Sequence, residues 1–179
     1  MWHFKSFVRM LQNKNNMSLN CQKALVFGFT SKKGIEELLR QVNLIKGDRI
    51  INSFLDIGSG DGQAVNHVKE LSNIERCVGI EIQKHWHETA IKKYPHLELY
   101  CDDIVNRPEF IKEFDLIYMN NIMFTNELFW WCFDNMKEGT VVINNKQTIS
   151  LALKRKGYEV KDFIMQANCT SKETSICVK

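Results

Sequence analysis

Residues 54–63 read FLDIGSGDGQ, and this stretch decides the predicted fold. Its first half, around Asp56, is the short and mostly apolar run expected of a buried strand. Its second half carries three glycines: Gly58, Gly60 and Gly62. Glycine lets a chain turn sharply and lets its backbone approach a ligand closely at the N-terminus of a helix. The stretch therefore predicts a strand, a ligand-binding turn and a helix that begins at Gln63.

Short apolar runs alternate with longer polar stretches through the rest of the chain, which predicts an α/β fold. We expect seven strands, at residues 53–57, 77–82, 97–101, 116–120, 140–144, 158–166 and 174–178. We expect helices at residues 31–42, 63–72, 84–94, 126–136 and 148–156. Continuously apolar strands indicate a mostly parallel sheet with helices on both faces. The last two strands lack room for a connecting helix, so we expect an antiparallel hairpin at one edge.

The composition is that of one folded domain. The chain has 179 residues, of which 44% are hydrophobic and 25% are charged, and these values exclude a disordered or fibrous protein. No apolar run approaches the roughly 18 residues of a membrane span. The six cysteines lie far apart without a Cys-x-x-Cys motif, which excludes a disulfide framework and favours a reducing compartment, nucleus or cytoplasm.

The charge is divided unevenly along the chain. Residues 1–35 contain six Lys and Arg and no Asp or Glu, so they carry +6. The remainder contains 18 basic and 21 acidic residues and carries −3. Such an asymmetry indicates an anionic partner or a targeting segment. We therefore predict a basic N-terminal arm at residues 1–27 and a ligand-binding domain at residues 28–179.

The arm has apolar residues at partly helical spacing, and cations lie between them: Lys5, Arg9 and Lys14. Three interpretations remain open. An amphipathic basic helix would contact the phosphates of nucleosomal DNA or of another nucleic acid. An acid-free amphipathic segment is also typical of a mitochondrial transit peptide. Alternatively, the helix packs on the sheet with its lysines in solvent.

Acidic residues at the strand ends indicate the ligand of the glycine-rich turn. A dinucleotide fingerprint would have glycine where Gln63 stands. Glu81 ends the second strand, where a carboxylate accepts hydrogen bonds from both hydroxyls of a ribose. After the third strand, Asp102 and Asp103 compete for the amino group of an adenine, and Ile104 would contact its ring. Acidic loops favour a cationic nucleoside, which predicts S-adenosyl-L-methionine, whose sulfonium is positively charged.

Four further segments carry a more specific pattern: GFTS at 28–31, NNIMF at 120–124, NMKEG at 135–139 and CTSKETS at 169–175. Together with Gln63 they resemble class I S-adenosylmethionine-dependent methyltransferases. Within that class they are similar to the DOT-like (disruptor of telomeric silencing) histone lysine methyltransferases, which lack a SET domain. The chain resembles a minimal catalytic core of this family.

The resemblance implies a Rossmann-like fold, S-adenosyl-L-methionine as cofactor and a protein lysine as substrate, with a histone in a nucleosome as the favoured acceptor. It assigns a set of residues to the cofactor: Thr30, Asp56, Gly58, Gly60, Gly62, Gln63, Glu81, Asp103, Ile104 and Asn120. It also implies that Asn121 and Phe124 shape the lysine channel. We expect the amide oxygen of Asn121, rather than that of Asn120, to orient the amine or the methionine group, because strand alternation turns one of the pair into the sheet.

Other functions are less well supported by the sequence. A methyltransferase of nucleic acids or small molecules would usually carry Asn/Asp-Pro-Pro-aromatic at Asn120, and this chain does not. An inactive cofactor-binding module is a third hypothesis, because Ile122 replaces an aromatic residue of the family. We expect no metal site, since His85 and His87 lie two residues apart on a helix and face different directions.

Overall fold

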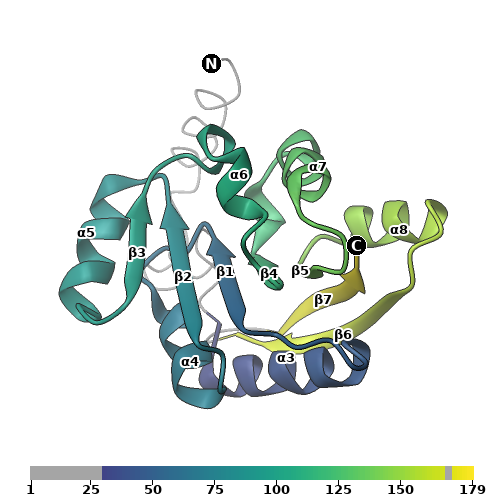
Figure 1. Ribbon diagram of the computed structural model, residues 1–179, viewed down its shortest axis with the longest axis horizontal. Coiled ribbons are helices and arrows are strands. Elements are labelled where there is room, and N and C mark those ends of the chain that lie inside the picture. Colours follow the sequence, from purple (N-terminus) through teal and green to yellow (C-terminus); the bar gives the residue numbers. More distant parts are fainter. Residues whose placement is uncertain (1–29, 168–170) are drawn as a thin grey trace, which may run out of the picture.

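Seven strands form one sheet in the computed structural model, which describes residues 30–167 and 171–179 (Figure 1). They are Ser53–Ile57 (β1), Arg76–Glu81 (β2), Glu98–Cys101 (β3), Leu116–Met119 (β4), Val141–Asn144 (β5), Val160–Gln166 (β6) and Ser171–Val178 (β7). Their order across the sheet is β3-β2-β1-β4-β5-β7-β6. The first five strands are parallel, and β7 is antiparallel to both β5 and β6.

The predicted basic arm lies outside the described residues, and so do its cations Lys5, Arg9 and Lys14. The start of the segment 169–175 also lies outside them.

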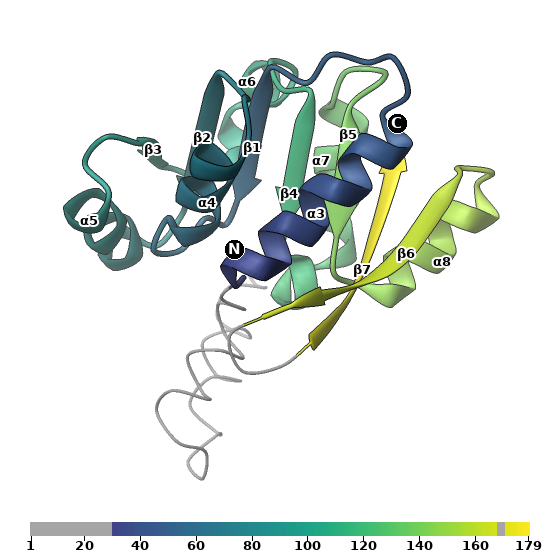
Figure 2. The same ribbon diagram turned by 90° about the horizontal axis from the view of Figure 1, so that it is seen from below.

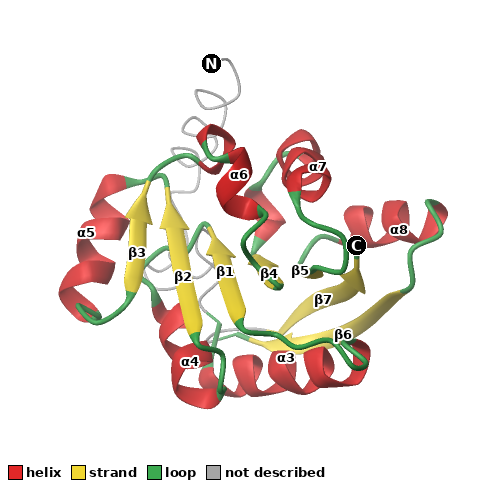
Figure 3. Cartoon of the chain, in the orientation of Figure 1, coloured by secondary structure: helices red, strands yellow, loops and turns green. Residues whose placement is uncertain are grey.

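Helices connect the strands, as Figure 3 shows by colour. They are Lys32–Ile45 (α3), Gln63–Leu71 (α4), Lys84–Lys93 (α5), Pro108–Ile111 (α6), Asn126–Asn135 (α7) and Gln147–Arg155 (α8), with 3₁₀ turns at Ile104–Asn106 (η1) and Asn121–Met123 (η2). The sequence prediction of seven strands, five longer helices and an edge hairpin is confirmed, with ends that differ by a few residues. The single-turn elements α6, η1 and η2 were not predicted, because one turn is too short to show a hydrophobic period.

The sheet is covered on both faces, and strand alternation divides the core in two. Phe54 of β1 belongs to the cluster beneath α3 and α4, whereas its neighbour Leu55 belongs to the cluster beneath α6, α7 and α8. Figure 2 shows α3 lying across its face of the sheet. All five residues of β1 are buried, which explains the apolar character of this strand. None of the helices in the described ranges is long and apolar enough to cross a membrane.

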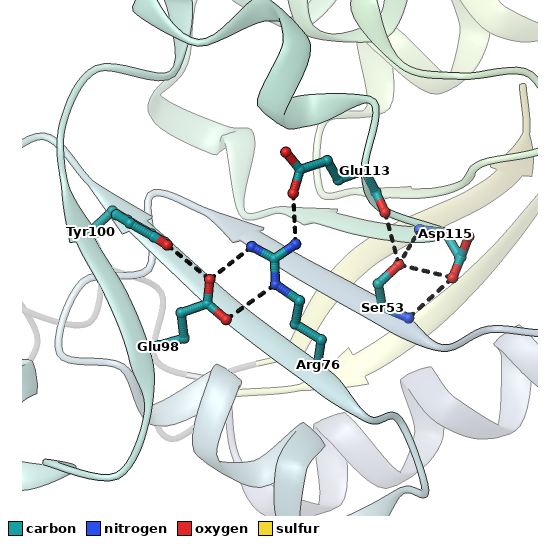
Figure 4. A network of polar contacts seen from close by, with 6 residues as sticks. All are labelled: Ser53, Arg76, Glu98, Tyr100, Glu113 and Asp115. Carbon is teal, nitrogen blue, oxygen red and sulfur yellow. Dashed lines mark hydrogen bonds and ion pairs between the residues drawn. The ribbon is translucent and has the colours of Figure 1, made fainter.

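The amino ends of the strands carry a network of paired polar groups (Figure 4). Arg76, at the start of β2, donates two hydrogen bonds to Glu98 and one of 2.6 Å to Glu113. Ser53, at the start of β1, donates through its backbone and its hydroxyl to one oxygen of Asp115. These contacts join β1, β2, β3 and the segment before β4 at the edge opposite the glycine-rich turn.

Candidate active site

The glycine-rich turn joins β1 to α4 at the carboxyl edge of the sheet. The N–H groups of Gly58 and Ser59 donate to the carbonyl oxygen of Ile80 at 2.8 and 3.1 Å, which holds the turn against β2. Gly58 has φ of +79°, and a Cβ atom there would lie 2.9 Å from the ring of Phe124. Only glycine fits this conformation and this close approach.

Glu81, the last residue of β2, is held rigidly beside the turn. Its side chain is 4% exposed. The N–H of Gly60 donates to Oε2 at 2.9 Å, and the N–H of Gln83 donates to Oε1 at 2.8 Å. Each carboxylate oxygen accepts one backbone hydrogen bond and keeps further acceptor capacity. This geometry fits the predicted contact with the hydroxyls of a ribose.

Asp56 lies in the wall of a pocket beneath the turn, together with Thr30, Gln63 and Asn120. Asp56 is 3% exposed, and its Oδ1 atom has no hydrogen-bond partner within the described part of the chain. Burial and the nearby charge of Glu81 raise the pKa of Asp56 to about 8. A buried carboxylate oxygen without a donor is costly unless a ligand supplies one. The ammonium group of S-adenosylmethionine is such a donor, so the residues present fit this cofactor.

Lys172 on β7 provides the opposite charge near Asp56. Its side chain is 6% exposed, and burial lowers its pKa to about 8, while the charge of Asp56 acts in the other direction. Lys172 lies within the predicted segment 169–175, but no local pattern predicts that it lies near the glycine-rich turn. The pairing of β7 with β5 makes this approach possible, because it turns the start of β7 towards the carboxyl edge.

Tyr118 is a second residue that the sequence analysis missed. It lines the same pocket from β4, is 1% exposed, and shares a hydrogen bond of 2.9 Å with the hydroxyl of Thr30. The backbone of Thr30 also forms an isolated bridge with Ala167 at the end of β6. The sequence signal that could have indicated Tyr118 was a tyrosine in an otherwise aliphatic strand. A buried tyrosine hydroxyl needs a hydrogen-bond partner, so such a residue points to a second polar group nearby.

The two aspartates after β3 have different surroundings. Asp102 receives a hydrogen bond of 2.6 Å from Arg107, and this contact lowers its pKa. Asp103 caps η1, and its Oδ1 accepts a hydrogen bond of 3.1 Å from the N–H of Val105. The second oxygen of Asp103 makes no hydrogen bond among the described contacts, so Asp103 is better placed than Asp102 to bind a ligand. Ile104 beside it is 4% exposed.

The two asparagines after β4 have different surroundings. Asn120 lines the pocket of the glycine-rich turn, whereas Asn121 is fully buried. The Oδ1 atom of Asn121 accepts a hydrogen bond of 2.8 Å from the N–H of Asn145. The expectation that this oxygen also faces the acceptor stays a prediction. Strand alternation ends at Met119, and η2 begins at Asn121, so the alternation on which the expectation rested does not continue.

Phe124 joins the glycine-rich turn to the start of α8. Its ring lies against Gly58, and its carbonyl oxygen accepts a hydrogen bond of 2.8 Å from Lys146 Nζ. Ile122 in the same loop is 46% exposed. Phe124 therefore places an aromatic ring against the glycine-rich turn that lines the pocket of Asp56.

Several solved structures that are described as methyltransferases share this fold. The structure of a putative caffeoyl-CoA O-methyltransferase from Staphylococcus aureus has a TM-score of 0.63 and 13% identity, and the match covers 100% of both chains. The methyltransferase domain of bacterial CtHen1 has a TM-score of 0.63 and 12% identity, covering 83% of this chain and 98% of that one. An O-methyltransferase from Bacillus cereus in complex with SAH has a TM-score of 0.56 and 14% identity, covering 97% and 89%. The protein has the Rossmann-like fold of class I methyltransferases.

The sequence itself identifies the family. Residues 8–176 match the family of histone methylation protein DOT1, so the chain belongs to that family. This confirms the resemblance found in the sequence. No curated protein matches the sequence. Family and fold together define a methyltransferase of the class that uses S-adenosylmethionine.

Proposed function

We propose that this chain is an S-adenosylmethionine-dependent protein lysine N-methyltransferase that acts on a core histone in a nucleosome. The observation that carries the proposal is the buried Asp56 oxygen without a donor beside the glycine-rich turn, in a chain of the DOT1 family. A nucleosomal substrate would require that the protein work in the nucleus. The basic arm would then contact nucleosomal DNA through its cations.

In this proposal, different residues of the chain bind different parts of the cofactor. Asp56 binds the ammonium group of the methionine end, and Glu81 binds the ribose hydroxyls. Asp103 accepts a hydrogen bond from the adenine amino group, and Ile104 contacts the adenine ring. When bound, S-adenosylmethionine supplies a methyl group on a sulfonium that is open to in-line attack by an amine.

The loop after β4 favours the neutral form of the acceptor lysine and orients its amine. A lysine ammonium has a pKa of about 10.4 in water and must lose a proton before it attacks. Phe124 and Ile122 surround the amine with apolar atoms, which disfavours its charged form and lowers its pKa. Asn120 orients the amine from the wall of the pocket. Positioning and the exclusion of water supply most of the acceleration, and no side chain needs to act as a strong base.

Methyl transfer from labelled S-adenosylmethionine to nucleosomes, free histones and RNA, assayed in parallel, tests the proposal. Mass spectrometry of the labelled product should find methyl-lysine in a histone, and Asn120→Ala should lower the amount of label by about tenfold or more. Label on RNA alone would assign the enzyme to nucleic acid. Cofactor binding without label on any substrate would identify an inactive module.

A further inference from the structure

A second pocket lies beside the proposed active site and shares no lining residue with the first. It has a volume of about 300 Å³ and is enclosed by the end of β5, the first turns of α8 and the facing strands β6 and β7. This volume accommodates one or two side chains of a ligand and lies at the small end of the range for ligand pockets. Nothing in the mechanism above uses this pocket.

The wall formed by β6 and β7 combines an apolar surface with a negative charge. Ile164 and Glu173 are direct partners in the antiparallel pair, so their side chains lie next to each other on one face. Ile164 is 60% exposed, and Glu173 is exposed as well. Such a pair suits a side chain with an apolar stem and a cationic end, because the stem covers the isoleucine while the head reaches the carboxylate.

The two carboxylates of this pocket differ in their availability. Asp162 is already engaged, since it accepts hydrogen bonds from Ser150 and Lys154. Glu173 has no hydrogen bond or ion pair with any described residue, although it stands in the wall of the pocket. Of these two acids, Glu173 is therefore the one that can bind a cation from outside.

A hydrogen bond links this second pocket to the loop after β4, which is proposed to bind the acceptor lysine. Lys146 stands in its wall and donates to the carbonyl oxygen of Phe124 at 2.8 Å. The neighbouring residue, Asn145, donates its N–H to Oδ1 of Asn121 in the same loop at 2.8 Å. An extended polypeptide advances about 3.3 Å per residue, so side chains within about three positions of the acceptor span roughly 10 Å on either side.

We infer that the pocket bounded by Ile164 and Glu173 binds a basic side chain, arginine or lysine, that flanks the acceptor lysine in a polypeptide substrate. This inference rests on the proposed function. It assigns sequence selectivity to the β6–β7 hairpin. The methyl-transfer site would then recognise the amine, and this pocket would recognise the residue beside it.

Direct peptide binding tests the inference independently of catalysis. Fluorescence anisotropy would measure the affinity of the full chain for peptides with one lysine and one arginine, with the arginine moved along up to about three positions on each side of the lysine. A matched set carries citrulline, which has the shape of arginine without its charge. At one position or more, the arginine peptide should bind about fivefold more tightly than its citrulline partner.

Glu173→Gln should abolish this preference for arginine, and Ile164→Ser should weaken the binding of arginine and citrulline peptides alike. Glu159→Gln is the matched control, because Glu159 is exposed next to the same hairpin and does not line the pocket. Absence of an arginine preference at every position, or a preference that survives in Glu173→Gln, would overturn the inference. If the preference follows Glu173 while no lysine is methylated, the proposed function fails and the pocket stands as a site for basic side chains.

Discussion

The two ends of the parallel strands, here called the amino edge and the carboxyl edge of the sheet, differ in whether their polar groups are paired. At the amino edge the carboxylates of Glu98, Glu113 and Asp115 all accept hydrogen bonds or ion pairs from neighbouring residues (Figure 4). At the carboxyl edge, buried polar atoms of Asp56 and Asn121 have no hydrogen-bond partner in the described parts of the chain. A buried polar atom without a partner costs about 1–3 kcal/mol. The amino edge is therefore built for stability, whereas the carboxyl edge gives up stability and keeps groups available for a ligand.

The largest effect is expected at Glu81. Glu81→Ala should weaken the binding of S-adenosylmethionine by about 100-fold or more, because it removes the proposed ribose contact and frees the N–H groups of Gly60 and Gln83. Isothermal titration calorimetry measures the loss. Glu75→Ala is the matched control, since Glu75 is exposed just before the same strand at the amino edge and should leave binding unchanged. Equal binding by wild type and Glu81→Ala would contradict the assignment.

The asparagine pair should separate catalysis from stability. Asn120→Ala should lower the rate of methyl transfer at saturating cofactor by about tenfold or more, because Asn120 lines the pocket. Asn121→Ala should lower the free energy of unfolding by about 1–3 kcal/mol, because it leaves the N–H of Asn145 without its acceptor. Single-turnover rates and urea unfolding measure the two effects. A stable Asn121→Ala protein that transfers no methyl groups would assign the orienting role to Asn121 instead of Asn120.

The pH dependence of cofactor binding tests the state of Asp56. Burial and the charge of Glu81 raise its pKa to about 8, against the opposing charge of Lys172, so the carboxyl group is mostly protonated at pH 6. An ammonium ligand binds the ionised form, so the affinity should rise between pH 6 and pH 8 by up to about tenfold per pH unit. In Asp56→Asn the binding should be weak and nearly independent of pH over the same range. A flat profile for the wild type would show that Asp56 is ionised throughout.

The smallest effect is expected at the amino edge. Arg76→Ala should lower the free energy of unfolding by about 1–2 kcal/mol, the modest value that suits a guanidinium of which 36% is exposed. Its hydrogen bonds lower the pKa of Glu98 from 4.5. A lowered carboxyl pKa contributes stability above the unfolded value, and this stability is lost as the pH falls through the folded value. The difference between wild type and Arg76→Ala should therefore shrink below pH 4.5.

Cofactor binding provides the control for this edge, because Arg76→Ala should bind S-adenosylmethionine with wild-type affinity once folded. Arg40→Ala breaks the exposed pair with Glu37 on α3 and should change stability far less than Arg76→Ala. If Arg76→Ala weakened cofactor binding as strongly as Glu81→Ala, the assignment of stability to the amino edge and of ligand binding to the carboxyl edge would be wrong.

The local motifs explain why the sequence could predict where the glycine-rich turn and Glu81 lie. The stretch from Asp56 to Gln63 is continuous in sequence, and Glu81 follows at the end of the next strand, so spacing alone brings these residues to one edge. Tyr118 and Lys172 escaped prediction because their contacts with Thr30 and Asp56 join distant parts of the chain. The different surroundings of Asn120 and Asn121 were not predicted because a 3₁₀ turn interrupts the strand alternation.

The sequence by itself determined the order of strands and helices, the glycine-rich turn and the acid at the end of β2. These features depend on hydrophobic period and on the conformations open to neighbouring residues, which are local properties. Only the tertiary structure decided that Lys172 lies near Asp56, that Asn120 faces the pocket, and that Glu173, beside Ile164 in a second pocket, has no partner among the described residues. Those outcomes depend on strand pairing and on burial, which bring segments together across the whole sheet and which no local pattern records.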